Sequence, residues 1–188
     1  MDAYLWIIVL LLAYTVALYP VLATLRLHHE EASGHAEALL STAVSRLRWA
    51  AAHLAVAALG TLALGGFVTG LIYSLVMVDP AVGRMLLAAL EHVPAAWLVG
   101  AFAAFAVGVL PRASVALSWR VWAVVIVVGD LGGPLIGLWG WSRVEPFHYT
   151  PNTVSGEPYT VAPLTLILSL TALLTATALI RLRDRDLG

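Results

Sequence analysis

The chain has 188 residues, of which 61% are hydrophobic and 11% are charged. Soluble domains usually carry about 25% charged residues, so this composition and a mean hydropathy of +0.92 place the chain among membrane proteins. Its formal net charge of −1 does not indicate a nucleic-acid partner. The absence of cysteine excludes disulfides, thiol catalysis, cysteine-ligated zinc and iron–sulfur clusters.

Five stretches are long and apolar enough to cross a hydrocarbon core of about 30 Å. Each is expected to be helical, because an open strand in lipid would leave backbone polar groups without hydrogen bonds. We therefore expect an all-α fold, a polytopic membrane protein whose single transmembrane domain covers residues 1–188. The expected spans cover about residues 3–25, 49–78, 94–110, 115–138 and 161–180.

Residues 26–48 connect the first two spans and are polar. Glu30 and Glu31 directly follow the first span, where the C-terminus of a helix disfavours anions. They are better placed if a short helix begins nearby with Ser33 as its N-cap, and Ser45 can then cap the second span. A helix that protrudes in this way can dock onto a cytoplasmic partner. The alternative is a helix that lies on lipid headgroups.

The same connection holds the densest cluster of histidine and glutamate. Glu31 and His35 are four residues apart and would share a helix face, so a metal site is one interpretation. The spacing matches no closed ligand set, however, and we expect a solvated loop without a metal. A haem or redox role would need facing histidines inside the membrane, and this assignment places only His53 within a span.

The second and third spans are rich in small residues. Gly66 and Gly70 form a GxxxG pair in the second span, a pattern suited to close contact between helices. The third span carries glycine and alanine along most of its length. We interpret both features as packing surfaces rather than as gates. The connection between the two spans, residues 79–92, is short and amphipathic.

Residues 111–120 form a tight connection in this assignment, and the fourth span follows. Asp130 is the only acidic residue within a predicted span. A charge is costly in lipid, so Asp130 is a candidate gate or pathway residue; the alternative is that it satisfies backbone groups freed by a break in the helix. A Gly-Gly-Pro sequence should break the helix near Gly132. A short re-entrant piece and a polar cap, the external loop 141–160, should follow.

The placement of arginine sets the expected orientation. With five spans, the two termini lie on opposite sides of the membrane. If the C-terminus is cytoplasmic, eight of the ten cationic residues face the cytoplasm, and only Arg84 and Arg143 lie outside. The positive-inside rule therefore predicts an external N-terminus and a cytoplasmic C-terminus in the cytoplasmic membrane. The eight residues are Arg26, Arg46, Arg48, Arg112, Arg120, Arg181, Arg183 and Arg185.

Residues 25–49 read LRLHHEEASGHAEALLSTAVSRLRW. This stretch resembles the cytoplasmic coupling region of ABC-2 type permeases, and in particular the actinobacterial polyketide-antibiotic-exporter permeases. The sequences at residues 94–97, 110–112, 145–151 and 181–187 are also similar, so the resemblance covers nearly the whole chain. Three positions depart from the family pattern: His35 replaces arginine, Ala38 replaces proline, and Glu145 stands where serine is frequent.

The resemblance implies the membrane half of an ATP-driven exporter that releases a lipophilic or amphiphilic compound outward. A separate ATPase subunit, which would bind ATP and Mg, would contact the short cytoplasmic helix. Family members are longer, and this chain resembles their last five spans. Either a second membrane subunit or further copies of this chain would supply the rest, or the chain is a fragment or truncated homologue. The implied ATPase-contact residues are Glu30, Glu31, Gly34, His35, Glu37, Leu40, Ser45 and Arg46.

We expect no catalytic residue and no resident cofactor in this chain, because nucleophile-elbow, P-loop and HExxH motifs are absent from the sequence. Two other function classes stay open. One is a non-transporting membrane scaffold or anchor that recruits a cytoplasmic partner. The other is a membrane enzyme or electron carrier that uses histidine and Asp130.

Overall fold

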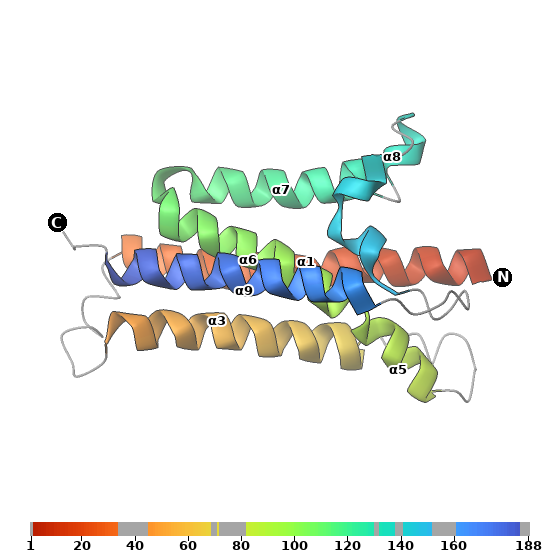
Figure 1. Ribbon diagram of the computed structural model, residues 1–188, viewed down its shortest axis with the longest axis horizontal. Coiled ribbons are helices and arrows are strands. Elements are labelled where there is room, and N and C mark those ends of the chain that lie inside the picture. Colours follow the sequence, from red (N-terminus) through yellow and green to blue (C-terminus); the bar gives the residue numbers. More distant parts are fainter. Residues whose placement is uncertain are drawn as a thin grey trace.

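The computed structural model describes residues 2–33, 45–68, 71, 82–129, 132–137, 141–151 and 161–184. Within these residues every regular element is a helix, which confirms the predicted all-α fold. Five helices are long and apolar enough to cross a membrane, and they form an elongated bundle (Figure 1). These candidate spans are Ile7–Ala32, Arg46–Val68, Leu86–Val109, Pro111–Val128 and Val161–Arg183.

The central helix is α6 (Val93–Val109). It contacts four helices: α1 (Asp2–Ala32), α3 (Arg46–Leu62), α7 (Ser114–Val128) and α9 (Val161–Arg183). Two-thirds of its span, 67%, is buried, against 11% for that of α9. Small residues make this possible: a Cβ added at Gly108 would lie 2.9 Å from Ala178 Cα of α9, and one at Gly100 would lie 2.6 Å from Pro20 Cβ of α1. The small-residue third span is thus the axis on which the other helices pack.

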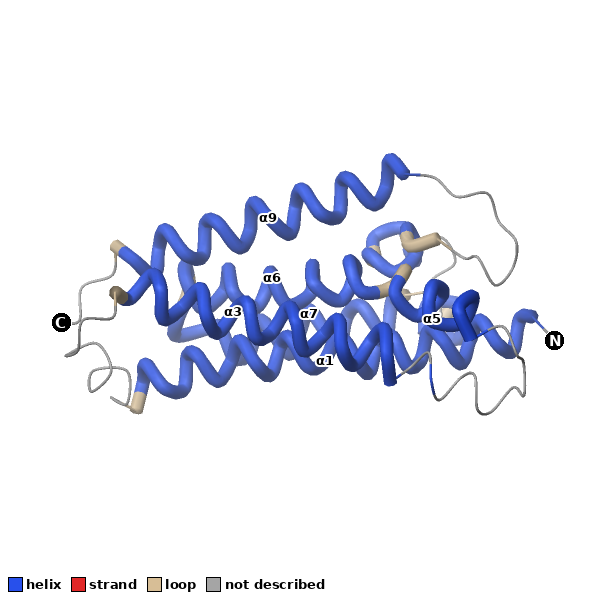
Figure 2. The backbone as a smooth tube through the Cα atoms, turned by 90° about the horizontal axis from the view of Figure 1, so that it is seen from below, coloured by secondary structure: helices blue, strands red, loops and turns tan. Residues whose placement is uncertain are grey.

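The neighbours of α6 do not form a closed ring. Direct contacts join α7 to α1, α1 to α3, and α3 to α9. Between α7 and α9, however, the described residues hardly touch. Figures 1 and 2 show α7 and α9 on different sides of α6, with α9 diverging toward the end of the bundle that holds the N-terminus.

Helix α1 is longer than the sequence predicted, because it continues to Ala32 rather than ending near residue 25. Glu30 and Glu31 therefore lie in its last turn, and the short helix predicted to follow Ser33 falls in residues 34–44, outside the described residues. Ser33 closes α1, since its hydroxyl donates to the Glu30 carbonyl at 3.3 Å. Ser45 is the N-cap of α3 and accepts a hydrogen bond from Arg48 N at 3.4 Å, as predicted.

The second span changes character near its end. Helix α3 continues into a π-helical segment, η1 (Ala63–Val68), and residues 69–70 and 72–81 lie outside the described part. Gly65 faces Val16 and Val93, while Gly66 faces Leu90 of α5 (Val82–Leu90). A Cβ at either position would crowd these side chains, which would have to shift to make room. Gly66 therefore occupies a close packing position; its predicted partner Gly70 is not among the described residues.

The fourth span differs from the prediction at both ends. The connection before it is only the turn η2 (Pro111–Ala113), so Arg120 lies inside α7 and not in a loop. Its helix ends at Val128, before the predicted break near Gly132, and Gly129 is extended with ψ −174°. A single turn, α8 (Gly132–Leu135), follows, and Gly137 has a positive φ of 76°. The break itself was predicted correctly, although it comes earlier because Gly129 leaves the helical conformation first.

The two ends of the bundle are different. We call the end that holds the C-terminus, η2 and the start of α3 the base, and the opposite end the cap end (Figure 1). The cap end holds the N-terminus, α5, α8, η3 (Trp141–Val144) and η4 (Pro146–Tyr149). Most of the described arginines belong to elements that begin or end at the base: Arg26, Arg46, Arg48, Arg112, Arg181 and Arg183.

Candidate functional site

Two side-chain contacts join α1 to α3 at the base. Glu31 Oε1 lies 3.4 Å from Arg46 Nη2, and Glu30 Oε2 lies 3.1 Å from His53 Nε2. The Glu31–Arg46 pair is largely buried, with 10% and 12% of the side chains exposed, whereas the Glu30–His53 pair is half-buried. These contacts tie together the two helices that bracket residues 34–44. They also place Glu30 and Glu31 opposite cationic or polar groups, which offsets their unfavourable position at a helix C-terminus.

The pairs rest on a buried apolar cluster drawn from four helices. Leu27, Trp49, Ala50, Val107 and Leu182 pack together beneath them. His28 Nδ1 and Trp49 Nε1 are buried there without a hydrogen-bond partner in the described part of the chain. A buried polar atom without a partner costs free energy. The base thus combines a buried apolar cluster with polar side-chain pairs at its edge.

Half of the predicted contact residues can be placed. Among the described ones, Glu30, Glu31 and Arg46 make the contacts above, and Ser45 caps α3. In the structure these side chains thus contact neighbouring side chains of α1 and α3 or the N-terminus of α3. Gly34, His35, Glu37 and Leu40 lie outside the described residues. Contact with an ATPase stays a prediction for all eight.

A buried carboxylate holds the cap end together. Tyr14 of α1 donates its hydroxyl to Glu145, with 2.8 Å to each carboxylate oxygen, and only 3% of Glu145 is exposed. Phe147 is equally buried and meets the Tyr14 ring edge-on, with 4.9 Å between centroids. Gly129, where α7 ends, lies directly against both Glu145 and the Tyr14 hydroxyl. The segment 141–151 is therefore a plug that docks onto α1 and the end of α7.

Sequence reasoning did not identify Glu145 as an interior residue. It treated residues 141–160 as an external loop and Asp130 as the acid of interest. The available signal was that Glu145 stands where the family resemblance has serine, next to an aromatic that could bury. Asp130 itself lies outside the described residues, so its predicted role is not addressed by the structure.

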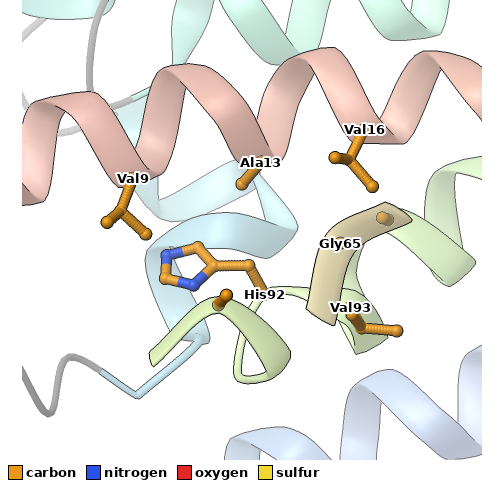
Figure 3. Close-up of a pocket in the computed structure, with 8 residues that line it drawn as sticks. Val9, Ala13, Val16, Gly65, His92 and Val93 are labelled. Atoms are coloured by element: carbon orange, nitrogen blue, oxygen red, sulfur yellow. The ribbon is translucent and has the colours of Figure 1, made fainter. Parts of the chain in front are cut away.

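A small cavity lies beside the plug, between α1, η1 and the turn that joins α5 to α6. Its volume is about 10 Å³, and its walls include Val9, Ala13, Gly65 and His92. Figure 3 shows the His92 side chain directed toward α1 across this space. His92 is buried, and its Nδ1 lies 3.0 Å from the carbonyl oxygen of Ala88. Room for at most a single water excludes this cavity as a substrate site.

The larger pockets are open grooves between helices. One of about 390 Å³ lies between α1 and α3 near the base, where Arg26, Glu30 and His53 line its polar side. Two others lie on either side of the plug, one against α6 and α9 and the other against α6 and α7. Among the described residues, no three histidine or acidic side chains are grouped so that they could hold a metal ion. The larger pockets are thus open, mainly apolar grooves on the sides of the bundle.

Comparison with known proteins gives one family. Residues 1–183 match the family described as multidrug efflux system permease Rv1217c, C-terminal domain. The chain is also 32% identical, over 194 aligned residues, to the multidrug efflux system permease protein Rv1217c of Mycobacterium tuberculosis (strain ATCC 25618 / H37Rv). This alignment covers 98% of the chain and 34% of the relative, so the chain spans about a third of the relative's length.

The match to the family includes both ends of the bundle. It covers the paired side chains of the base as well as the plug at the cap end, since both fall within residues 1–183. The five apolar helices are those of a multi-pass membrane protein. This chain belongs to the family of the C-terminal domain of the Rv1217c multidrug efflux system permease.

Proposed function

We propose that this chain is the permease subunit of an ATP-driven ABC-2 type exporter that moves a lipophilic or amphiphilic compound out across the cytoplasmic membrane. The family membership supports the efflux part of this proposal. The observation that carries the ATP-driven part is the base. There α1 extends beyond its apolar stretch and is tied to α3 by Glu31–Arg46 and Glu30–His53.

The contacts of α1 provide a route by which a movement at the base would be transmitted to the cap end. An ATPase that closes on ATP and Mg would move residues 34–44, and the paired side chains would pass the movement to α1 and α3 together. Helix α1 packs along the central α6, and its Tyr14 holds Glu145 of the plug. A shift of α1 would therefore reach the plug through one rigid element. ATP hydrolysis takes place in the partner chain, and this chain carries no catalytic residue.

The proposed orientation places the base in the cytoplasm and the N-terminus outside. Its support is the concentration of arginine at the base together with the positive-inside rule. Two exposed positions test it in this cysteine-free chain: Ala32→Cys at the base and His148→Cys on the plug. In intact cells an impermeant maleimide should label His148→Cys and spare Ala32→Cys. The reverse labelling pattern would show that the orientation is inverted.

The remaining spans of the exporter would come from a second membrane subunit or from further copies of this chain. The ATP-driven step is tested in proteoliposomes that contain the chain, its co-encoded membrane polypeptide and a co-encoded ATPase with a P-loop. A lipophilic fluorescent dye should leave the bilayer on addition of ATP and Mg. It should not do so when the P-loop lysine of the ATPase is replaced by alanine. Dye movement that is equal in both preparations would reject ATP-driven export.

A membrane scaffold that recruits a cytoplasmic partner without transport is the second candidate. The same observation favours it, since the polar base offers a docking surface whether or not a compound moves. The proteoliposomes separate the two functions. A scaffold predicts that the ATPase binds the chain at the base while ATP-dependent dye movement is absent.

A further inference from the structure

The surface of α6 that lies between α7 and α9 is the floor of a continuous groove. One pocket, of about 390 Å³, lies between α6, α9 and the plug, and the other, of about 370 Å³, lies between α6, α7 and the plug and reaches Leu174 of α9. The two share the wall residues Leu98, Val144 and Pro146. One pocket follows α7 from Leu117 to Val125, and the other follows α9 from Ala162 to Leu170. The groove therefore runs from the plug into the middle of the bundle. Everywhere else around α6, adjacent helices close the ring by direct contact.

Arg120 stands on the wall of this groove. It is the tenth of the eighteen residues of the span Pro111–Val128, and so lies near the middle of the span. From Arg112 at the end of the span to Arg120 the helix rises roughly 12 Å, at 1.5 Å per residue. The guanidinium can reach back toward the base, but the side chain starts from the apolar stretch of α7 and lines the groove together with Leu117 and Val121. Arg120 is thus a cation placed within the apolar zone.

The guanidinium of Arg120 has no hydrogen-bond or ion-pair partner in the part of the chain that the structure describes. Cations inside a membrane normally face the bundle interior and pair with another group. The walls of the groove are otherwise almost wholly apolar, and Glu145 at its far end is already held by Tyr14. An acceptor on the occupant of the groove would therefore find Arg120 available as a donor.

The occupant that these observations fit is a helix. The groove lies where the ring of helices around α6 is open. The helices on its two sides belong to spans of 18 and 23 residues, and the groove extends along much of their length. The alignment leaves about two-thirds of the relative's length outside the match, which is room for further spans. A lipid chain could cover the apolar walls, but it would not hold an acceptor at the depth of Arg120.

We propose that the groove between α7 and α9 is the seat of a further transmembrane helix, supplied by polypeptide outside residues 1–188, with an acidic or amide side chain opposite Arg120. This inference rests on the part of the proposed function that assigns the remaining spans to other polypeptide. It adds the position of one such span and the chemistry of its contact. It does not depend on ATP or on transport.

Two leucines of α9 provide a matched test. Leu170 lines the groove, whereas Leu168 lies on the opposite face of α9, and their exposed fractions are 40% and 42%. Each is replaced in turn by a photoreactive amino acid in the native host, with the full assembly present. Irradiation at position 170 should produce a crosslink to a peptide from another polypeptide. That peptide should contain a long apolar run with an Asp, Glu, Asn or Gln within it.

Position 168 should give at least fivefold less of this crosslink. Lipid adducts alone at position 170 would overturn the proposal, because they would make the groove a lipid site. Crosslinks from position 170 to a second copy of this chain would also overturn it. Equal yields at the two positions would show that the groove is not a specific seat.

Variants of Arg120 test the contact itself. Arg120→Glu should lower the position-170 crosslink at least tenfold, Arg120→Gln should lower it less, and Arg120→Lys should retain most of it. A basic residue in place of the acid on the crosslinked helix should restore the yield for Arg120→Glu. Equal membrane amounts of each variant exclude a simple folding failure, and unchanged yields in all three would reject the pairing. If the crosslink forms but the dye does not move on addition of ATP, this inference stands and the proposed exporter function is rejected.

Discussion

The base and the cap end both join α1 to another part of the bundle, but they do so by different physics. At the base, polar and charged side chains meet at the edge of the core, and one of the two pairs is only half-buried. At the cap end, a carboxylate and an aromatic ring are inserted among helices with almost no exposure. Exposed ion pairs contribute little and can be exchanged, whereas buried contacts are costly to break. The comparison suggests a base that can respond to a partner and a cap end that holds its geometry.

The largest effect is expected from removing the anchor of the plug. Phe147→Ala should destabilise the bundle by about 3–5 kcal/mol, because it empties a packed site against Tyr14 and His92. Denaturant unfolding in detergent, followed by tryptophan fluorescence, measures the change. Limited proteolysis should at the same time cut within 141–151.

Tyr149→Ala is the matched control for Phe147→Ala. Tyr149 belongs to the same short helix, but 43% of it is exposed. The Tyr149→Ala variant should lose much less stability than Phe147→Ala and should remain resistant to protease at the plug. If Phe147→Ala and Tyr149→Ala behave alike, the plug is not anchored as the structure indicates, and the contrast between the two ends fails.

The next effect concerns the hydrogen bond inside the cap end. Tyr14→Phe removes the hydroxyl that donates to the buried Glu145 carboxylate and should cost about 1.5–3 kcal/mol, the range for bonds to charged groups. Tyr149→Phe removes an exposed bond to the Arg143 carbonyl and should cost less. Unfolding midpoints of the two variants give the comparison directly. Equal losses would mean that burial does not strengthen the Tyr14–Glu145 contact.

Much of the fold could be predicted from the sequence, because long apolar runs in a membrane have few other conformations. The five spans, the break after the fourth and the Ser45 cap are of this kind. The end of α1 was misplaced because apolarity marks where a helix leaves lipid, not where it ends. Residues 28–31 are polar but remain helical, and Glu30 and Glu31 have partners on α3.

The residues that distinguish the two ends could not be found in the same way. Glu145 reads as a loop residue, and its burial depends on Tyr14, which is 131 positions away in the chain. Arg120 was counted with the cytoplasmic arginines because it follows Pro111 closely, yet η2 turns within three residues and α7 carries Arg120 into the span. Both errors concern long-range packing, which local composition does not encode.

A smaller loss of stability is expected at the base, where the charges of Glu31 and Arg46 can be exchanged between the two positions. Glu31→Arg places two cations together and should lower ATPase stimulation and reduce stability by about 1 kcal/mol or more. The double variant Glu31→Arg/Arg46→Glu restores an ion pair of reversed polarity and should recover most of both. Stimulated ATP hydrolysis in the reconstituted assembly and unfolding in detergent are the measurements. If stability recovers while stimulation does not, Glu31 or Arg46 contacts the ATPase directly instead of only holding α1 to α3.

The smallest effect is expected for the half-buried pair, and it tests whether the base is divided into a fixed and an adjustable part. Glu30→Gln keeps the size of the side chain and removes its charge, so it should cost at most about 1 kcal/mol, the upper end for solvent-accessible pairs. When His53 carries a proton, raising the salt concentration should narrow the difference in stability from the parent chain, because solvent-accessible charges are screened. Glu31→Gln, at the more buried pair, should cost more and should respond less to salt. The free energy of unfolding of both variants is measured at low and at high salt. Equal, salt-sensitive losses would show that the two pairs form one solvated surface. The Glu31–Arg46 pair would then not transmit movement from the base to α1.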